Sequence, residues 1–135
     1  MNYFLDTNIC IYLLNDKFHQ IREKIGNLNT SDIKISSVVA AELIYGAYKS
    51  EKREYNLSMF GKFLSAYEII PFDKSMINIY GEIRAELERK GKMIGWNDLL
   101  IAATVMANGG VLVTNNTDEF SRIDKLILED WTKEK

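Results

Sequence analysis

The stretch Tyr3-Phe4-Leu5-Asp6-Thr7-Asn8 decides how the rest of the sequence is interpreted. Its first three residues form a short apolar run that is typical of a buried strand. Thr7 and Asn8 are residue types that often cap helices, and the apolar segment 9–14 that follows predicts a helix. The stretch therefore predicts a buried strand that passes directly into a helix, with one aspartate at the junction.

Short apolar runs and helix-like segments alternate along the rest of the chain. Strands are expected at residues 33–36, 69–70, 111–113 and 125–128, and helices at 18–25, 54–67, from a Ser36 or Ser37 cap to Lys49, from an Asp73 cap to Lys90 and from an Asn97 cap to Ala107. This alternation predicts an α/β fold in which a central parallel sheet is flanked by helices. Sites in such folds lie at the carboxyl ends of the strands, so we expect the chemistry near residues 6–8, 36–37, 71–73 and 114–119.

Length and composition limit the class of protein. The chain has 135 residues, 47% of them hydrophobic, which is enough for one core and predicts a single domain over residues 1–135. One cysteine, Cys10, and one histidine, His19, exclude an internal disulfide and a multi-histidine metal centre. The net charge of −2 excludes a strongly basic nucleic-acid wrapper. The N-terminus is unlike a signal peptide and no apolar stretch is long enough to span a bilayer, so we expect a cytoplasmic protein without a membrane partner.

Three carboxylates stand alone in the most apolar parts of the sequence. Each is the only charged residue in its stretch: Asp6 within residues 1–15, Glu42 within 35–48 and Asp98 within 93–117. Asp6 could cap a helix, and Asp98, in the first turn of its helix, could be stabilised by the helix dipole. Glu42 could be an ordinary exposed helix residue. A lone buried carboxylate is otherwise unfavourable by several kcal/mol unless something compensates its charge.

A single pocket above the sheet could collect all three acids. Carboxylates within a few ångströms of each other repel and raise each other's pKa. A bound cation resolves that repulsion, and oxygen ligands favour the hard ions Mg²⁺ and Mn²⁺. Such an ion keeps several waters and suits phosphate chemistry.

Four stretches of the sequence together resemble the PIN-domain ribonucleases, and more closely the VapC toxins of bacterial toxin–antitoxin pairs. They occur in family order and cover nearly the whole chain. The stretches are Leu5-Asp6-Thr7-Asn8-Ile9; Ser36-Ser37-Val38-Val39 leading to Glu42-Leu43-Ile44-Tyr45-Gly46-Ala47; Ile94-Gly95-Trp96-Asn97-Asp98 leading to Ile101-Ala102-Ala103; and Val113-Thr114-Asn115-Asn116-Thr117 leading to Phe120.

The resemblance implies a PIN-domain fold and a toxic endoribonuclease that depends on Mg²⁺ or Mn²⁺. Asp6, Glu42 and Asp98 match the family's three acids, with Asp6 and Asp98 as metal ligands and Glu42 completing the shell or holding a water. The fourth acidic position departs from the pattern, because its first candidate is Asn116. We favour Glu119 there, with Asn116 as a neutral contributor and the neighbouring Asp118 as a helix cap.

The resemblance also implies supporting residues, substrate contacts and partners. Thr7, Asn8 and Thr114 are expected to support the acids, with Thr114 donating a hydrogen bond to one of them or to the phosphate. Trp96 could stack on an RNA base or pack in the core, and Lys92 could contact a phosphate or simply favour a helix dipole. The implied substrate is RNA, possibly a transfer RNA. The implied partners are a cognate VapB antitoxin and a second copy of the chain, in a homodimer or a larger toxin–antitoxin assembly in the bacterial cytoplasm.

Two other functions fit parts of the sequence. A PIN-fold module that binds RNA or protein without cleaving it would share the fold and need no complete acidic site. A phospho-receiver domain would also be a small α/β domain with an acidic magnesium pocket. It would need paired acids after the first strand and a lysine after the last one, whereas Asp6 stands alone and Thr114 and Asn115 follow Val113.

Overall fold

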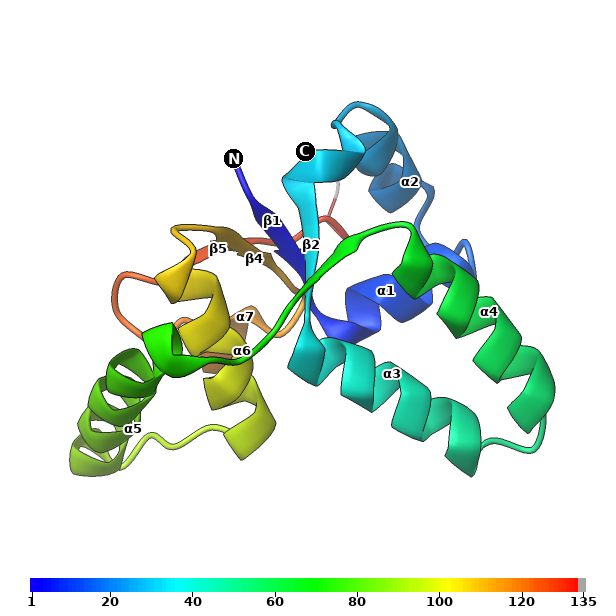
Figure 1. Ribbon diagram of the computed structural model, residues 1–135. Helices are drawn as coiled ribbons and strands as arrows, with labels where there is room; N and C mark the ends of the chain where they lie inside the picture. Colours follow the sequence, from blue (N-terminus) through cyan, green and yellow to red (C-terminus); the bar gives the residue numbers. More distant parts are fainter. Residues whose placement is uncertain (134–135) are drawn as a thin grey trace.

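The computed structural model describes residues 1–133, in which five parallel strands form one sheet (Figure 1). The strand order is β3-β2-β1-β4-β5, so the first strand lies at the centre. The strands are β1 (Tyr3–Leu5), β2 (Ile33–Ser36), β3 (Glu68–Ile70), β4 (Val111–Val113) and β5 (Ile127–Glu129). The helices are α1 (Thr7–Leu14), α2 (His19–Gly26), α3 (Ser37–Lys49), α4 (Arg53–Ser65), α5 (Ile77–Lys90), α6 (Trp96–Ala107) and α7 (Thr117–Phe120), with 3₁₀ turns at Thr30–Asp32 and Lys74–Met76.

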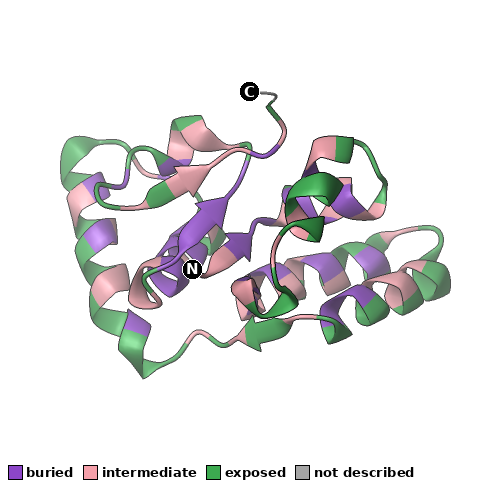
Figure 2. Cartoon of the chain, turned by 90° about the horizontal axis from the view of Figure 1, so that it is seen from above, coloured by how far each residue is buried: buried purple, intermediate pink, exposed green. Residues whose placement is uncertain are grey.

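The central strands are buried because both faces of the sheet are covered. Phe4 and Leu5 of β1 are 1% exposed and all three residues of β4 are buried (Figure 2). Leu5 pairs with Val113, and the Asp6 amide donates to the Val113 carbonyl at 2.9 Å. The carboxyl ends of the two central strands are therefore held side by side, which confirms the predicted α/β fold and parallel sheet.

The helices form two pairs beside the sheet (Figure 1). On one side α3 packs against α4, and on the other α5 packs against α6. Figure 2 shows buried residues on the central strands and on the inward-facing parts of the helices, with exposed residues on the outer parts. Cys10, expected in the core, is fully buried on α1. No helix within the described part of the chain is long and apolar enough to cross a bilayer.

The starts of two helices can be compared with the sequence prediction. Asp6 is the N-cap of α1, because its side chain accepts from the Thr7 amide at 2.9 Å. This confirms the capping role considered for Asp6, whereas Thr7 and Asn8 lie within the helix. Gly95 rather than Asn97 precedes α6 in extended backbone. The helix consequently begins at Trp96, a residue that the glycine-flanked sequence suggested for a loop.

Other boundaries shift by a turn or less. Asp73 caps the 3₁₀ turn Lys74–Met76, and the long helix α5 begins only at Ile77. The last strand is Ile127–Glu129 instead of residues 125–128, since Lys125 adopts a left-handed backbone conformation with φ of 70° that interrupts an extended run. The short helix α7 was not predicted, because four residues are too few to show a helical period.

The contact between Gly110 and β1 provides a test of the packing. A Cβ atom at Gly110 would lie 2.9 Å from the Asn2 carbonyl oxygen and 2.9 Å from the ring of the buried Phe4. Backbone and a buried ring cannot both yield, so we expect Gly110→Ala to lower the free energy of unfolding by about 2 kcal/mol. Chemical denaturation measures the change.

Gly81→Ala is the matched control for this substitution. Gly81 lies within α5, and nothing stands within 4 Å of the position that a Cβ atom would take there. An alanine at this position should raise the free energy of unfolding by about 0.5–1 kcal/mol through helix propensity. Equal effects of the two substitutions would show that β1 and the residue before β4 are not packed as described.

Candidate functional site

Asp6 directly follows the central strand β1 and is a buried acid. Its Oδ1 accepts from the Thr7 amide at 2.9 Å, and its Oδ2 accepts from the Thr114 hydroxyl at 2.8 Å. Only 7% of the residue is exposed, and burial raises the pKa of Asp6 above 3.8 although both hydrogen bonds act to lower it. The end of β1 and the residue after β4 are thus joined through one buried carboxylate.

Glu42 approaches Asp6 from helix α3. The Thr7 hydroxyl donates to Glu42 Oε1 at 2.7 Å, while the Thr7 amide donates to Asp6. One threonine therefore bridges two carboxylates that are far apart in the sequence. This bridge fixes the start of α1 against α3.

Asp98 enters the same region from the first turn of α6. The pKa of Asp98 is raised from 3.8 to about 6, first by burial and then by the negative charges of Asp6, Glu42 and Glu119, in that order of effect. A Cβ at Gly95 would lie 3.5 Å from Asp98 Oδ2, so the carboxylate lies back over the start of its own helix. The four acids are close enough to influence one another electrostatically.

The fourth acid and its neighbour Asn116 are joined to the same network. The backbone N–H of Asn116 donates to the Thr114 hydroxyl at 3.0 Å. The Asn116 side-chain Nδ2 donates to Glu119 Oε2 at 3.4 Å. Asp118, expected as a cap, lies within α7, which Asn116 precedes. Asn8 is exposed on the first turn of α1 and takes no part in the hydrogen bonds that join the acids.

No basic side chain neutralises this cluster within residues 1–133. None of the ion pairs there involves Asp6, Glu42, Asp98 or Glu119. In the same part of the chain, no three acidic, histidine or cysteine side chains already stand as metal ligands. An all-oxygen donor set suits Mg²⁺ or Mn²⁺.

A groove of ≈ 660 Å³ opens beside these acids, between α3 and α6. Glu42 and Thr7 lie in it, and Tyr45 forms part of its α3 wall. Its full lining is Thr7, Ser37, Val38, Ala41, Glu42, Tyr45, Asn97 and Leu100. From the sequence, Asn97 is expected only as a helix cap. The spacing of residues 38, 41, 42 and 45 predicts a shared helix face, but not that this face lies opposite α6.

The two expected RNA contacts have different surroundings. Trp96 is 66% exposed, which excludes the alternative of core packing. Lys92 lines a separate hollow of ≈ 480 Å³ with Asp118 and Arg122, and not the groove that contains Glu42. Trp96 directly precedes Asn97 of the groove, so it is the better placed of the two.

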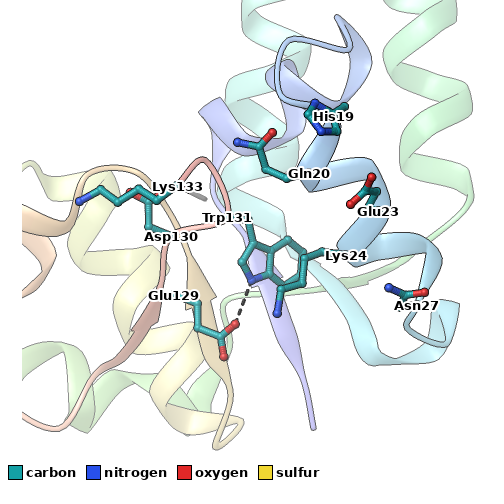
Figure 3. A pocket seen from close by; sticks show the side chains of 9 residues that line it. All are labelled: His19, Gln20, Glu23, Lys24, Asn27, Glu129, Asp130, Trp131 and Lys133. Carbon is teal, nitrogen blue, oxygen red and sulfur yellow. Dashed lines mark hydrogen bonds between the residues drawn. The ribbon is translucent and has the colours of Figure 1, made fainter. Parts of the chain in front are cut away.

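A further hollow of ≈ 520 Å³ lies between α2 and the segment after β5 (Figure 3). The indole of Trp131 is at its centre and donates to Glu129 at 2.9 Å. Lys24 and the exposed His19 also line it, but none of the four acids does. This hollow is therefore separate from the acidic site.

Comparisons with known proteins agree with the fold. A profile described as PIN domain matches residues 3–126. The chain is 52% identical over 136 residues to Ribonuclease VapC2 of Rickettsia felis, covering 98% of this chain and 100% of the relative. It is 42% identical over 132 residues to the tRNA(fMet)-specific endonuclease VapC of Shigella flexneri, covering 98% of this chain and 99% of the relative.

Solved structures give the same result. A DNA-bound VapBC crystal structure from Salmonella typhimurium superposes with a TM-score of 0.91 at 45% identity, covering 97% of this chain and 98% of the other. The structure of VapBC2 from Rickettsia felis, bound to a DNA fragment from its promoter, superposes with a TM-score of 0.88 at 47% sequence identity. The match covers 97% of this chain and 99% of the other. The buried strand that ends in Asp6 is thus part of a known architecture, and the chain belongs to the PIN domain family and, within it, to the VapC ribonucleases.

Proposed function

We propose that this protein is the toxin of a type II toxin–antitoxin pair, an endoribonuclease that hydrolyses RNA phosphodiester bonds at a site for Mg²⁺ or Mn²⁺. The observation that carries the proposal is the Asp98 carboxyl, half buried in the field of three other acids and, within residues 1–133, in no ion pair with a base. Uncompensated carboxylates at the carboxyl edge of a parallel sheet favour cation binding. The relatives named ribonuclease support the choice of RNA as the substrate.

Asp6 and Asp98 would hold the cation, with Glu42 and Glu119 completing the acidic surroundings. When bound, the ion lowers the pKa of a water and holds the scissile phosphate. The residues of the chain fix where this happens. Thr114 orients Asp6 through its hydroxyl, and Thr7 orients Glu42. Attack by water in line with the departing 3′ oxygen would leave a 5′-phosphate and a 3′-hydroxyl.

Asn116 would tie the fourth acid to this arrangement. It donates from its backbone to Thr114 and from its side chain to Glu119. The favoured position for the fourth acid is therefore Glu119, with Asn116 as a neutral support. No side chain needs to act as a nucleophile, because water supplies the attacking oxygen.

The partners of the reaction follow from the relatives. Several similar structures are VapBC complexes, so we infer a cognate VapB-type antitoxin and an assembly that contains more than one chain. A basic side chain of the antitoxin placed among the four acids would neutralise them and exclude the cation. Two relatives are named tRNA(fMet)-specific endonucleases, which makes a transfer RNA the favoured substrate.

Cleavage of a small-RNA pool tests the activity. Purified protein without antitoxin should produce discrete fragments with Mg²⁺ or Mn²⁺ and none with chelator. Asp98→Asn and Glu119→Gln should each lower the rate by more than about 100-fold, because each removes charge from the cation site. Gel analysis of end-labelled RNA measures both effects.

Asp118→Asn is the matched control, since Asp118 is an exposed acid that adjoins Glu119 on α7. It should cleave at the wild-type rate. Full activity in chelator would contradict the proposed chemistry. A folded wild-type protein that binds RNA but never cleaves it would instead favour a binding-only PIN module.

The charge of Asp98 also predicts a pH-dependent stability. Because the pKa of Asp98 is raised from 3.8 to about 6 on folding, the folded state binds the proton more tightly than the unfolded state. This contribution to stability is present at low pH and is lost as pH rises through about 6. In chelator, Asp98→Asn should therefore be more stable than wild type at about pH 7.5, and the gap should narrow at about pH 5. Thermal unfolding of both proteins at the two pH values measures this difference in stability. A difference that does not change with pH would contradict a raised pKa for Asp98.

A further inference from the structure

We propose that two exposed aromatic side chains, Trp96 at the start of α6 and Tyr45 in the groove between α3 and α6, act as stacking platforms for unpaired nucleobases. This inference rests on the proposed function, because it assigns the residues that position the RNA. It concerns side chains outside the cluster of acids. Both residues should therefore affect substrate binding more than the chemical step.

Trp96 has the geometry of a platform. It is 66% exposed at the first residue of α6, and the guanidinium of Arg84 lies 5.3 Å from its ring centroid. Arg84 is itself fixed, since it donates to the Tyr80 hydroxyl at 3.0 Å and to Glu88 at 3.2 Å. The guanidinium holds one face of the indole in place and leaves much of the ring open to solvent.

Tyr45 on α3 also has a cation beside its ring. It is 65% exposed, and Lys49 Nζ lies 5.9 Å from its ring centroid. Tyr45 lines the groove together with Glu42, one turn earlier on the same helix. Trp96 lies outside the groove, one residue before Asn97 of its α6 wall and two residues before Asp98. The two aromatic residues are thus close in sequence to acids of the site on two different helices.

The charge of the groove explains why the RNA needs such platforms. Glu42 lies in the groove and Asp98 lies nearby, and neither is neutralised by a base within residues 1–133. Carboxylates repel phosphates, so apart from the one phosphate that a bound cation would hold, the attraction for RNA has to come from residues around the site. Aromatic rings stack on any base, and the cations beside them attract the backbone.

The same argument selects unpaired RNA. In a duplex both faces of each base are covered by neighbouring bases, whereas bases in loops and single strands are free to stack on a protein ring. An exposed tryptophan and tyrosine beside the site therefore favour a loop or a single strand. The alternative occupant is a protein surface, either the antitoxin or a second copy of this chain, and the experiment separates these outcomes.

Intrinsic fluorescence provides a direct measurement. The chain has two tryptophans, and Trp131 is 4% exposed while Trp96 is open to solvent. Protein carrying Asp98→Asn, so that the RNA stays intact, is titrated with a hexa-adenylate strand and with a blunt RNA duplex. The strand should quench the emission and the duplex should not. Adding Trp96→Phe should abolish the quenching, because the responding ring is gone.

Cleavage kinetics on a tRNA transcript give the second measurement. Trp96→Ala and Tyr45→Ala should each raise KM by at least about fivefold with kcat within about twofold, and Trp96→Phe should restore most of the wild-type KM. Tyr55→Ala is the matched control, since Tyr55 on α4 is equally exposed at 65% but lines none of the grooves described above. It should leave both constants unchanged.

The outcomes that overturn the inference differ from those that overturn the proposed function. An unchanged KM for Trp96→Ala, or equal quenching by strand and duplex, would refute the stacking role while cleavage by the wild type stands. A loss of dimer mass in Trp96→Ala on light scattering, with KM unchanged, would assign the ring to a protein interface. If the wild type cleaves no RNA, the function fails, and the fluorescence titration still decides whether Trp96 binds bases.

Discussion

Mutual repulsion between partly buried carboxylates is the constraint on which this structure depends. Asp6 is fixed at the end of the central strand by the Thr7 amide and the Thr114 hydroxyl, and it cannot turn away without losing both bonds. Asp98 faces it from α6 with a pKa raised to about 6. Such an arrangement is unfavourable for the chain alone and becomes favourable once a cation neutralises it. In the free protein, the uncompensated negative charge of the site therefore favours the binding of a cation.

That attraction would explain how the same residues serve both catalysis and inhibition in the proposed function. A divalent ion and a basic side chain from a partner would satisfy the same carboxylates, and only the ion would supply an activated water. The groove between α3 and α6 contains Glu42 and Tyr45, and the exposed Trp96 directly precedes Asn97 of its α6 wall. The acids would set the chemistry, while the aromatic residues and their cations would set where the RNA lies.

Much of this could be predicted from the sequence, because its signals are local. The apolar run before Asp6 and the helix start at Ser36 predicted the central strand and α3, and the structure confirms both. The start of α6 was misplaced because Asn97 is a better capping type than Gly95, yet the glycine precedes the helix. The pairing of Trp96 with Arg84 and the groove itself join residues from different elements, so no local pattern reports them. The roles of the four acids remain predictions that the geometry supports.

Calorimetric titration of the free protein with Mn²⁺ tests the central claim most directly. The ion must displace the proton of Asp98, so binding at about pH 6 should release protons, and fewer should be released at about pH 8. Repeating the titration in buffers of different ionisation enthalpy counts these protons. Saturable binding with this pH dependence, weakened in Asp6→Asn, is the result that the account predicts. A folded protein that takes up no Mn²⁺ at millimolar concentration, or that binds it without releasing protons at about pH 6, would contradict it.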